Sequence, residues 1–133
     1  MSVSIPKSHS DLLRDETRAF AVVATTMPDG SPQATPVWFD MDGDSLCFNT
    51  ARGRVKERNL SARPEVAIVI VDPRDPYRYV QIRGSVREIT GEEARKHIDR
   101  LAEKYTGKPK YENYRGEERV KYCLQIESTS TMG

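Results

Sequence analysis

The sequence lacks several features that mark particular classes of protein. Among its 133 residues no apolar run approaches the ~20 residues that a membrane-spanning helix needs. The formal net charge is only +1, so bulk charge does not favour binding to nucleic acid. The N-terminal stretch, MSVSIPKSHSDLL, has no basic segment followed by an apolar one. We therefore expect a cytoplasmic protein with no membrane span, no targeting signal and no nucleic-acid partner.

Residues that bind metals or form catalytic motifs are also scarce. The chain has two histidines and two cysteines, and it contains no GxGxxG, P-loop, CxxC or HExxH motif. We expect His9 in a mobile N-terminal segment and His97 exposed on a helix, each without partners for a triad or a metal site. Cys47 and Cys123 lie in strand-like runs, which favours two reduced, buried thiols and leaves a disulfide between them open. The catalytic residues stay unknown, so an enzyme with this sequence needs a bound cofactor for its chemistry.

What the sequence does contain is a series of short strand-like runs. Apolar runs and alternating patterns predict strands over 18–27, 33–40, 45–50, 65–71, 78–89 and 119–127. Tight turns join most neighbouring strands and favour antiparallel pairing, and a small barrel best closes the edges of so few strands. The prediction is a single, mainly β domain over 1–133. It is a six-stranded antiparallel barrel with two or three short helices, and its ends at 1–9 and 128–133 are expected to be flexible.

The stretch FNTARGRVKERNL, residues 48–60, concentrates positive charge at the start of a short predicted helix. Its cations are Arg52, Arg54, Lys56 and Arg58, and Gly53 allows a tight turn into the helix. Backbone N–H groups at a helix start are partly positive, so each cation there costs about 0.3–1 kcal/mol unless an anion joins it. A phosphate site and a solvated helix surface are both consistent with this pattern.

A second stretch, QATPVWF over residues 33–39, places a proline inside a predicted strand. Pro36 frees neighbouring backbone groups from the ladder, and a planar ring with amide-like edges can bind such groups. Trp38, the only tryptophan, would add a flat apolar wall. Taken by itself, the stretch favours the simpler interpretation of an edge strand with a core tryptophan.

Together, these motifs resemble a known family. The order DGSPQATPVWF, FNT, RVKERNL and PEVAIVI, within residues 12 to about 127, is similar to the pyridoxamine 5′-phosphate oxidase-like split-barrel flavoproteins. The resemblance is greater to their branch that uses the deazaflavin coenzyme F420. It implies an FMN-binding split-barrel fold and a homodimer with the cofactor at its interface. It also implies a set of cofactor-binding residues: Thr50, Arg54, Lys56 and Asn59 at the phosphate, Arg52 and Arg58 at the oligoglutamate tail, Thr35, Pro36, Val37 and Trp38 at the ring, and Tyr79 reaching across from the partner chain.

The function implied by the resemblance is an F420H2-dependent reductase. Such an enzyme transfers a hydride from the deazaflavin to an electron-poor small molecule, namely a quinone, enone, tetrapyrrole or nitro-compound. The sequence lacks the C-terminal segment with which vitamin-processing oxidases of this fold bind their substrate, so pyridoxamine phosphate is not expected. An FMN-dependent oxidoreductase on the same fold and a non-catalytic flavin or deazaflavin carrier are the alternatives. An RNA-binding barrel is disfavoured by the low net charge.

Overall fold

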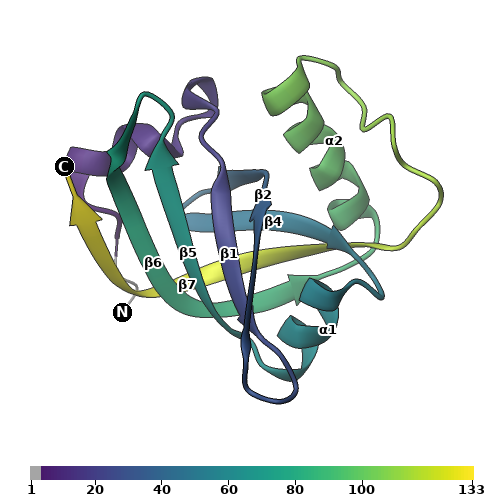
Figure 1. Cartoon of the computed structure of the whole chain (residues 1–133). Helices are drawn as coiled ribbons and strands as arrows, with labels where there is room; N and C mark the ends of the chain where they lie inside the picture. Colours follow the sequence, from purple (N-terminus) through teal and green to yellow (C-terminus); the bar gives the residue numbers. More distant parts are fainter. Residues whose placement is uncertain (1–3) are drawn as a thin grey trace.

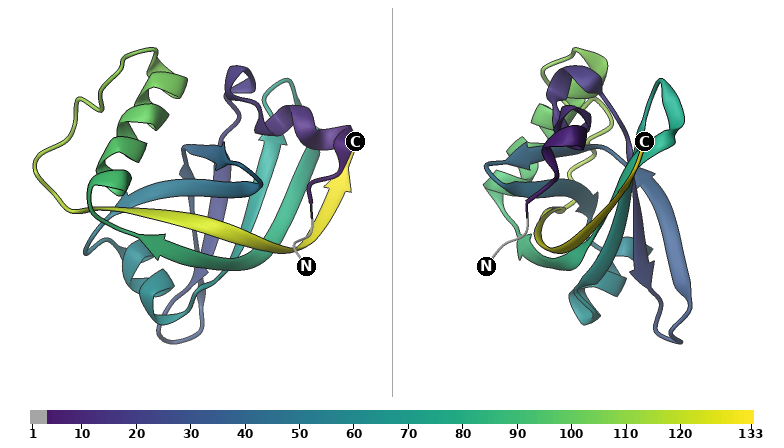
Figure 2. Two further views of the ribbon diagram at one scale, coloured as in Figure 1. Left: turned by 180° about the vertical axis from the view of Figure 1, so that it is seen from behind. Right: turned by 90° about the vertical axis from the view of Figure 1, so that its left-hand side faces the viewer.

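One strongly curved antiparallel sheet forms the body of the molecule. A computed structural model describes residues 4–133 and arranges seven strands in the order β2-β1-β5-β6-β7-β4-β3 (Figure 1). The strands are β1 (Ala21–Thr26), β2 (Pro32–Val37), β3 (Phe39–Asp42), β4 (Ser45–Ala51), β5 (Glu65–Asp72), β6 (Asp75–Ile89) and β7 (Arg119–Met132). The helices are α1 (Val55–Ala62), α2 (Glu92–Thr106) and two 3-10 helices, η1 (Lys7–Leu13) and η2 (Asp15–Thr17). The curved sheet forms a split half-barrel (Figure 2).

The predicted count of six strands is wrong, because the run over 33–40 forms two strands. The chain leaves β2 at Val37 and enters β3 at Phe39, with Trp38 between them. β2 and β3 lie at opposite edges of the sheet formed by residues 4–133, next to β1 and β4 respectively. Pro36 is on the edge strand β2, where its missing N–H costs no interior ladder bond, as the simpler interpretation expected. One apolar run therefore connects both edges of the sheet around Trp38.

The core lies on the inner face of the curved sheet. Alternate residues of the central strands are buried there: Val66, Ile68, Ile70, Val80, Ile82, Val120, Tyr122 and Leu124. Each such side chain contributes about 1.5–3 kcal/mol through burial. The pairing of β6 with β7 shifts register between Arg83 and Gly84, and a Cβ at Gly84 would collide with the carbonyl oxygen of Gln125. Glycine therefore allows the two long strands to approach closely where they bend.

Helix α2 covers the other face of β4 and β7. Its residues Ala94, Ile98 and Leu101 are buried against these strands. Beneath the helix Cys47 and Cys123 are directly opposite each other on β4 and β7, and the structure joins them in a disulfide. The expectation of two reduced thiols is thus corrected. The two cysteines are 76 residues apart in the chain, so only the strand register shows that they meet.

The ends of the chain are more ordered than the sequence predicted. Of the expected flexible end at 1–9, residues 1–3 lie outside the described residues, and Lys7–Leu13 form η1. His9 is buried, not mobile, and its Nε2 donates to the carbonyl oxygen of Met132 at 3.0 Å. The expected flexible end at 128–133 instead continues β7 through Met132, paired with β6. The C-terminus and the N-terminal 3-10 helices consequently lie side by side (Figures 1 and 2).

Candidate active site

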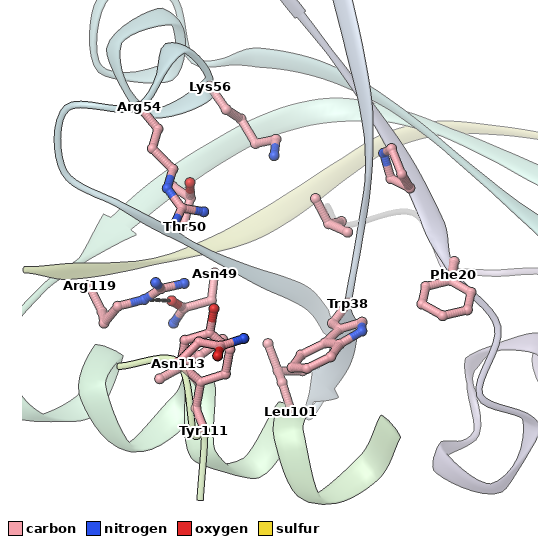
Figure 3. A pocket seen from close by; sticks show the side chains of 13 residues that line it. Phe20, Trp38, Asn49, Thr50, Arg54, Lys56, Leu101, Tyr111, Asn113 and Arg119 are labelled. Atoms are coloured by element: carbon pink, nitrogen blue, oxygen red, sulfur yellow. Dashed lines mark hydrogen bonds between the residues drawn. The ribbon is translucent and has the colours of Figure 1, made fainter. Parts of the chain in front are cut away.

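A cavity of about 390 Å³ lies between the link from β2 to β3, the end of β4, and the helices α1 and α2 (Figure 3). It brings together six residues predicted from the sequence: Pro36, Val37, Trp38, Thr50, Arg54 and Lys56. They come from two separate stretches, which meet because β3 pairs with β4 immediately after the break at Trp38. The volume is within the ordinary range for a small-molecule site.

Aromatic packing fixes Trp38, which forms the flat wall of the cavity. Its ring stacks on Tyr105 of α2, with centroids 5.4 Å apart and planes 8° from parallel, and it meets the edge of Tyr111 at 6.1 Å. The hydroxyl of Tyr105 donates to the carbonyl oxygen of Ala19 at 2.6 Å. Burial raises the pKa of Tyr105 well above its ordinary value, so the phenol remains protonated. The tryptophan is therefore held rigidly from two sides.

The opposite part of the cavity is cationic. Arg54 is the N-cap residue of α1, and Lys56 lies in the helix's first turn. Within residues 4–133 neither side chain has a hydrogen-bond or salt-bridge partner, and no carboxylate lines the cavity. Burial, and then the neighbouring charge of Arg54, lower the pKa of Lys56. Two unpaired cations, with the Thr50 hydroxyl nearby, can bind an anion such as a phosphate.

The other two arginines of the basic stretch lie outside the cavity. Arg52 donates to Glu88 at 2.7 Å and to Glu118 at 2.8 Å, and it lies 3.4 Å from Glu57. Arg58 is exposed on α1. Glu57 itself accepts from the backbone N–H of Gly53 at 2.7 Å, and that bond is the main cause of the lowered pKa of Glu57. The carboxylate of Glu57 therefore offsets part of the positive charge at this helix start, an interaction that was not predicted from the sequence.

Three further predicted residues are also outside the cavity lining. Asn59 is buried and donates from Nδ2 to Thr25 Oγ1 at 3.0 Å, so it ties α1 to β1. Thr35 lies on β2, and its Oγ1 is buried without a partner among the described residues. Tyr79 lies on β6 opposite Val71 and does not reach the cavity of its own chain. Its assignment stays a prediction that depends on a partner chain.

A buried polar chain that was not predicted from the sequence lies on the α2 side of the cavity. His97, expected to be exposed, is completely buried, and its Nε2 lies 2.8 Å from Asp40 Oδ1. Its Nδ1 lies 3.1 Å from Asn49 Nδ2, and Asn49 Oδ1 accepts from Arg119 Nε at 2.9 Å. Asn49 and Arg119 both line the cavity, as do Tyr111 and Asn113. The expectation for His97 is wrong because α2 turns this residue toward the sheet.

Two structural findings concern possible membrane and metal binding. None of the helices formed by residues 4–133 is both long and apolar enough to cross a membrane. The same residues contain no group of three or more histidine, cysteine or carboxylate side chains able to hold a metal ion.

Comparisons with known proteins agree with this architecture. The family model described as pyridoxamine 5′-phosphate oxidase matches residues 5–132. A solved structure described as an F420 reductase is 33% identical, with a TM-score of 0.82, over 95% of this chain and 98% of its own. A conserved hypothetical protein from Mycobacterium tuberculosis is 20% identical, with a TM-score of 0.76, over 98% of this chain and 86% of its own. A heme-binding protein from Mycobacterium smegmatis is 22% identical, with a TM-score of 0.67, over 98% of this chain and 56% of its own. The latter two share the fold alone, and no curated protein sequence matches the chain.

Proposed function

Because the chain belongs to the pyridoxamine 5′-phosphate oxidase family, we propose that it is an F420H2-dependent reductase of an electron-poor small molecule. The observation that carries this proposal is the cavity, in which Arg54 and Lys56 face no carboxylate and Trp38 forms a flat wall. The likeness to a solved F420 reductase, at 33% identity over nearly the whole length of both chains, supports the choice of deazaflavin. Quinones, enones, tetrapyrroles and nitro-compounds are the proposed acceptors.

The residues present fit a cofactor that has both a phosphate and a planar ring. Arg54 and Lys56 would hold the phosphate, with the Thr50 hydroxyl as a further donor. Pro36, Val37 and Trp38 would contact the ring and exclude water from one side of it. When bound, reduced deazaflavin supplies two electrons as a hydride. The protein contributes binding, orientation and a defined electrostatic environment.

A proton is also needed to complete the reduction, and the aromatic wall does not supply it. The Tyr105 hydroxyl already donates to the carbonyl oxygen of Ala19, and its pKa is raised by burial. It is therefore a weak acid whose proton is engaged elsewhere. We assign the proton to water entering the cavity.

A comparison of the two candidate cofactors tests the proposal. Purified apo protein is titrated with F420 and, separately, with FMN, and the fluorescence of Trp38, the sole tryptophan, is recorded. Saturable quenching by F420 at low concentration, followed by oxidation of F420H2 in the presence of an acceptor, is the expected result. Tight binding of FMN alone favours the FMN-dependent alternative. Tight F420 binding with no turnover of a quinone, an enone or a nitro-compound favours a carrier.

We also propose that two chains associate through the outer face of β1, β2 and β5. Val22 is 36% exposed there and faces Val69 on β5, and the neighbouring Phe20 is 54% exposed. Phe20 and Pro36 also line the cavity, so a second copy on this face would close its open side. That arrangement would give the partner's Tyr79 a route to the cofactor.

Val22→Asp should convert a dimer to a monomer in sedimentation equilibrium, and it should weaken cofactor binding. A wild-type protein that sediments as a monomer would contradict the proposed dimer.

A further inference from the structure

The buried polar chain on the α2 side has a hydrogen-bond pattern that fixes the orientation of each member. Asn49 Nδ2 donates to the carbonyl oxygen of Ala94 at 3.0 Å, so the amide nitrogen must face α2. Its second hydrogen points to His97 Nδ1, which therefore accepts, and the proton on His97 is placed on Nε2, facing Asp40. Asn49 Oδ1 is left to accept from Arg119 Nε. This polar chain thus orients the guanidinium of Arg119. It does not neutralise the positive charge, because the acceptor is the neutral amide oxygen of Asn49.

The remaining donors of Arg119 are available to the cavity. The Arg119 side chain is only 3% exposed, and its Nη1 donates to Glu117 at 2.9 Å. Nη2 has no hydrogen-bond partner within residues 4–133. It is nevertheless not fully buried, because the only fully buried side-chain nitrogen or oxygen without a partner in those residues is Thr35 Oγ1. Nη2 is consequently accessible, and Arg119 is part of the cavity lining (Figure 3). A preoriented, nearly buried donor therefore faces the site.

The charge of Arg119 is already balanced, which distinguishes it from Arg54 and Lys56. The Arg115 backbone N–H, helped by Arg119, lowers the pKa of Glu117 to about 2, so this residue is a carboxylate at neutral pH. A second full anion on Arg119 would compete with Glu117. A neutral carbonyl oxygen would not compete, and it can accept from the free N–H groups.

On the basis of the proposed reductase function, we infer that Arg119 binds the carbonyl oxygen of a conjugated acceptor. The substrate class is an α,β-unsaturated carbonyl compound. A hydride arriving at the β carbon breaks the C=C π bond, and the electron pair moves to the carbonyl oxygen as an enolate. The bond from Arg119 strengthens as negative charge develops on that oxygen, although less than it would without Glu117, which already pairs with the guanidinium. A proton from water then converts the enolate to the saturated carbonyl compound. The acceptor is reduced by two electrons, and the reduced deazaflavin is oxidised.

The test uses the whole chain with F420H2 and 2-cyclohexen-1-one as the acceptor. Arg119→Gln should lower kcat by about 100-fold, as removal of an oxyanion donor does, because the interaction strengthens in the transition state. The Kd for F420 should stay within about twofold of the wild-type value, since Arg54 and Lys56 are intact. Arg87→Gln is the matched control: it removes an exposed arginine of β6 that does not line the cavity, and should leave both values unchanged.

Each contrary result identifies what has failed. An unchanged kcat in Arg119→Gln overturns the inference and leaves the reductase function intact. A parallel rise in the Kd for F420 also overturns it, because Arg119 would then belong to the cofactor site. Wild-type protein that binds F420 but never reduces the enone overturns this substrate class. Wild-type protein that does not bind F420 overturns the proposed function itself, and this inference with it.

Two milder variants keep the test valid if Arg119→Gln does not fold. Glu117→Gln removes the counter-charge and keeps the arginine, so kcat with 2-cyclohexen-1-one should rise severalfold. Asp40→Asn allows the side chain at position 40 to donate to His97 Nε2, so that the proton of His97 moves to Nδ1. The Asn49 amide would then turn its oxygen toward His97. Its nitrogen would face Arg119 Nε, and two donors would oppose each other there. We expect kcat to fall while the Kd for F420 does not change, as for a positioning residue. Unchanged kcat in both variants would overturn the inference.

Discussion

Lys56 provides the sharpest test of the phosphate site, because its side chain is half-buried and has no charged partner among residues 4–133. A charge-assisted hydrogen bond to a phosphate oxygen is worth about 1.5–3 kcal/mol. At ~1.4 kcal/mol for each factor of ten, its loss corresponds to roughly 10- to 150-fold in affinity. Lys56→Ala should therefore raise the Kd for F420 more than about tenfold.

The measurement is an equilibrium titration of Trp38 fluorescence with F420. The control is Lys96→Ala, which removes a lysine that is 67% exposed on α2, where its Nζ is 3.4 Å from Glu92. This variant loses the same charge from the whole protein but none from the cavity, so its Kd should match that of the wild-type chain.

A phosphate contact at Lys56 is contradicted if Lys56→Ala and Lys96→Ala both bind F420 as tightly as the wild-type protein. The basic stretch would then be a solvated helix surface, as the simpler interpretation of the sequence holds. If both variants lose affinity equally, long-range charge rather than a local contact governs binding, and that outcome also contradicts a phosphate contact at Lys56.

Three other predictions follow from the same structure. The pKa of Lys56 lies below 10.5 in the free protein, and a bound phosphate would raise it, so F420 affinity should be full at neutral pH and fall as the pH rises toward 10.5. The decline should vanish in titrations of Lys56→Ala. Asn59→Ala should lower the free energy of unfolding by about 1–3 kcal/mol, because it leaves the Thr25 hydroxyl without its donor; denaturant unfolding measures this. An unchanged stability with weakened F420 binding would instead restore Asn59 to the cofactor site. Replacing Cys47 and Cys123 with alanine should cost about 2–4 kcal/mol in the same assay, since the disulfide closes a long loop. Equal stability of the wild-type chain with and without reductant would contradict the bond.

The sequence predicted the strands well because one side of each is buried. The alternation of Val80 and Ile82 with polar residues places β6, and the tight turns indicate antiparallel neighbours. It predicted one strand too few because the apolar pattern continues through Trp38. The chain changes its pairing partner at that residue: β2, before it, pairs with β1, and β3, after it, pairs with β4. Periodicity reports which face of a strand is apolar, but it does not report where a strand exchanges its partner.

The candidate site was predictable only in part, for a related reason. Thr50, Arg54 and Lys56 follow one another closely, so a local motif was enough to bring them together. Arg119 is the first residue of an alternating strand and has the pattern of a solvent-facing residue, but α2 covers that face. The burial of His97 depends on the same docking. The face of the sheet that a helix covers depends on tertiary packing, so no short stretch of this sequence predicts it.

The position of β7 in the sheet determines when the molecule can be completed during synthesis. Within residues 4–133, β3 and β4 form a hairpin that joins the remaining strands solely through β7. Ribosomes make Arg119–Met132 after the six strands that precede β7 in the described residues, so the hairpin stays detached until β7 emerges. Until then Phe48, which the finished fold buries completely, lacks its neighbour Tyr122 of β7, whose ring centroid lies 5.7 Å from its own. Nascent chains of this protein thus have a long interval in which chaperones, or unwanted neighbours, can reach its interior.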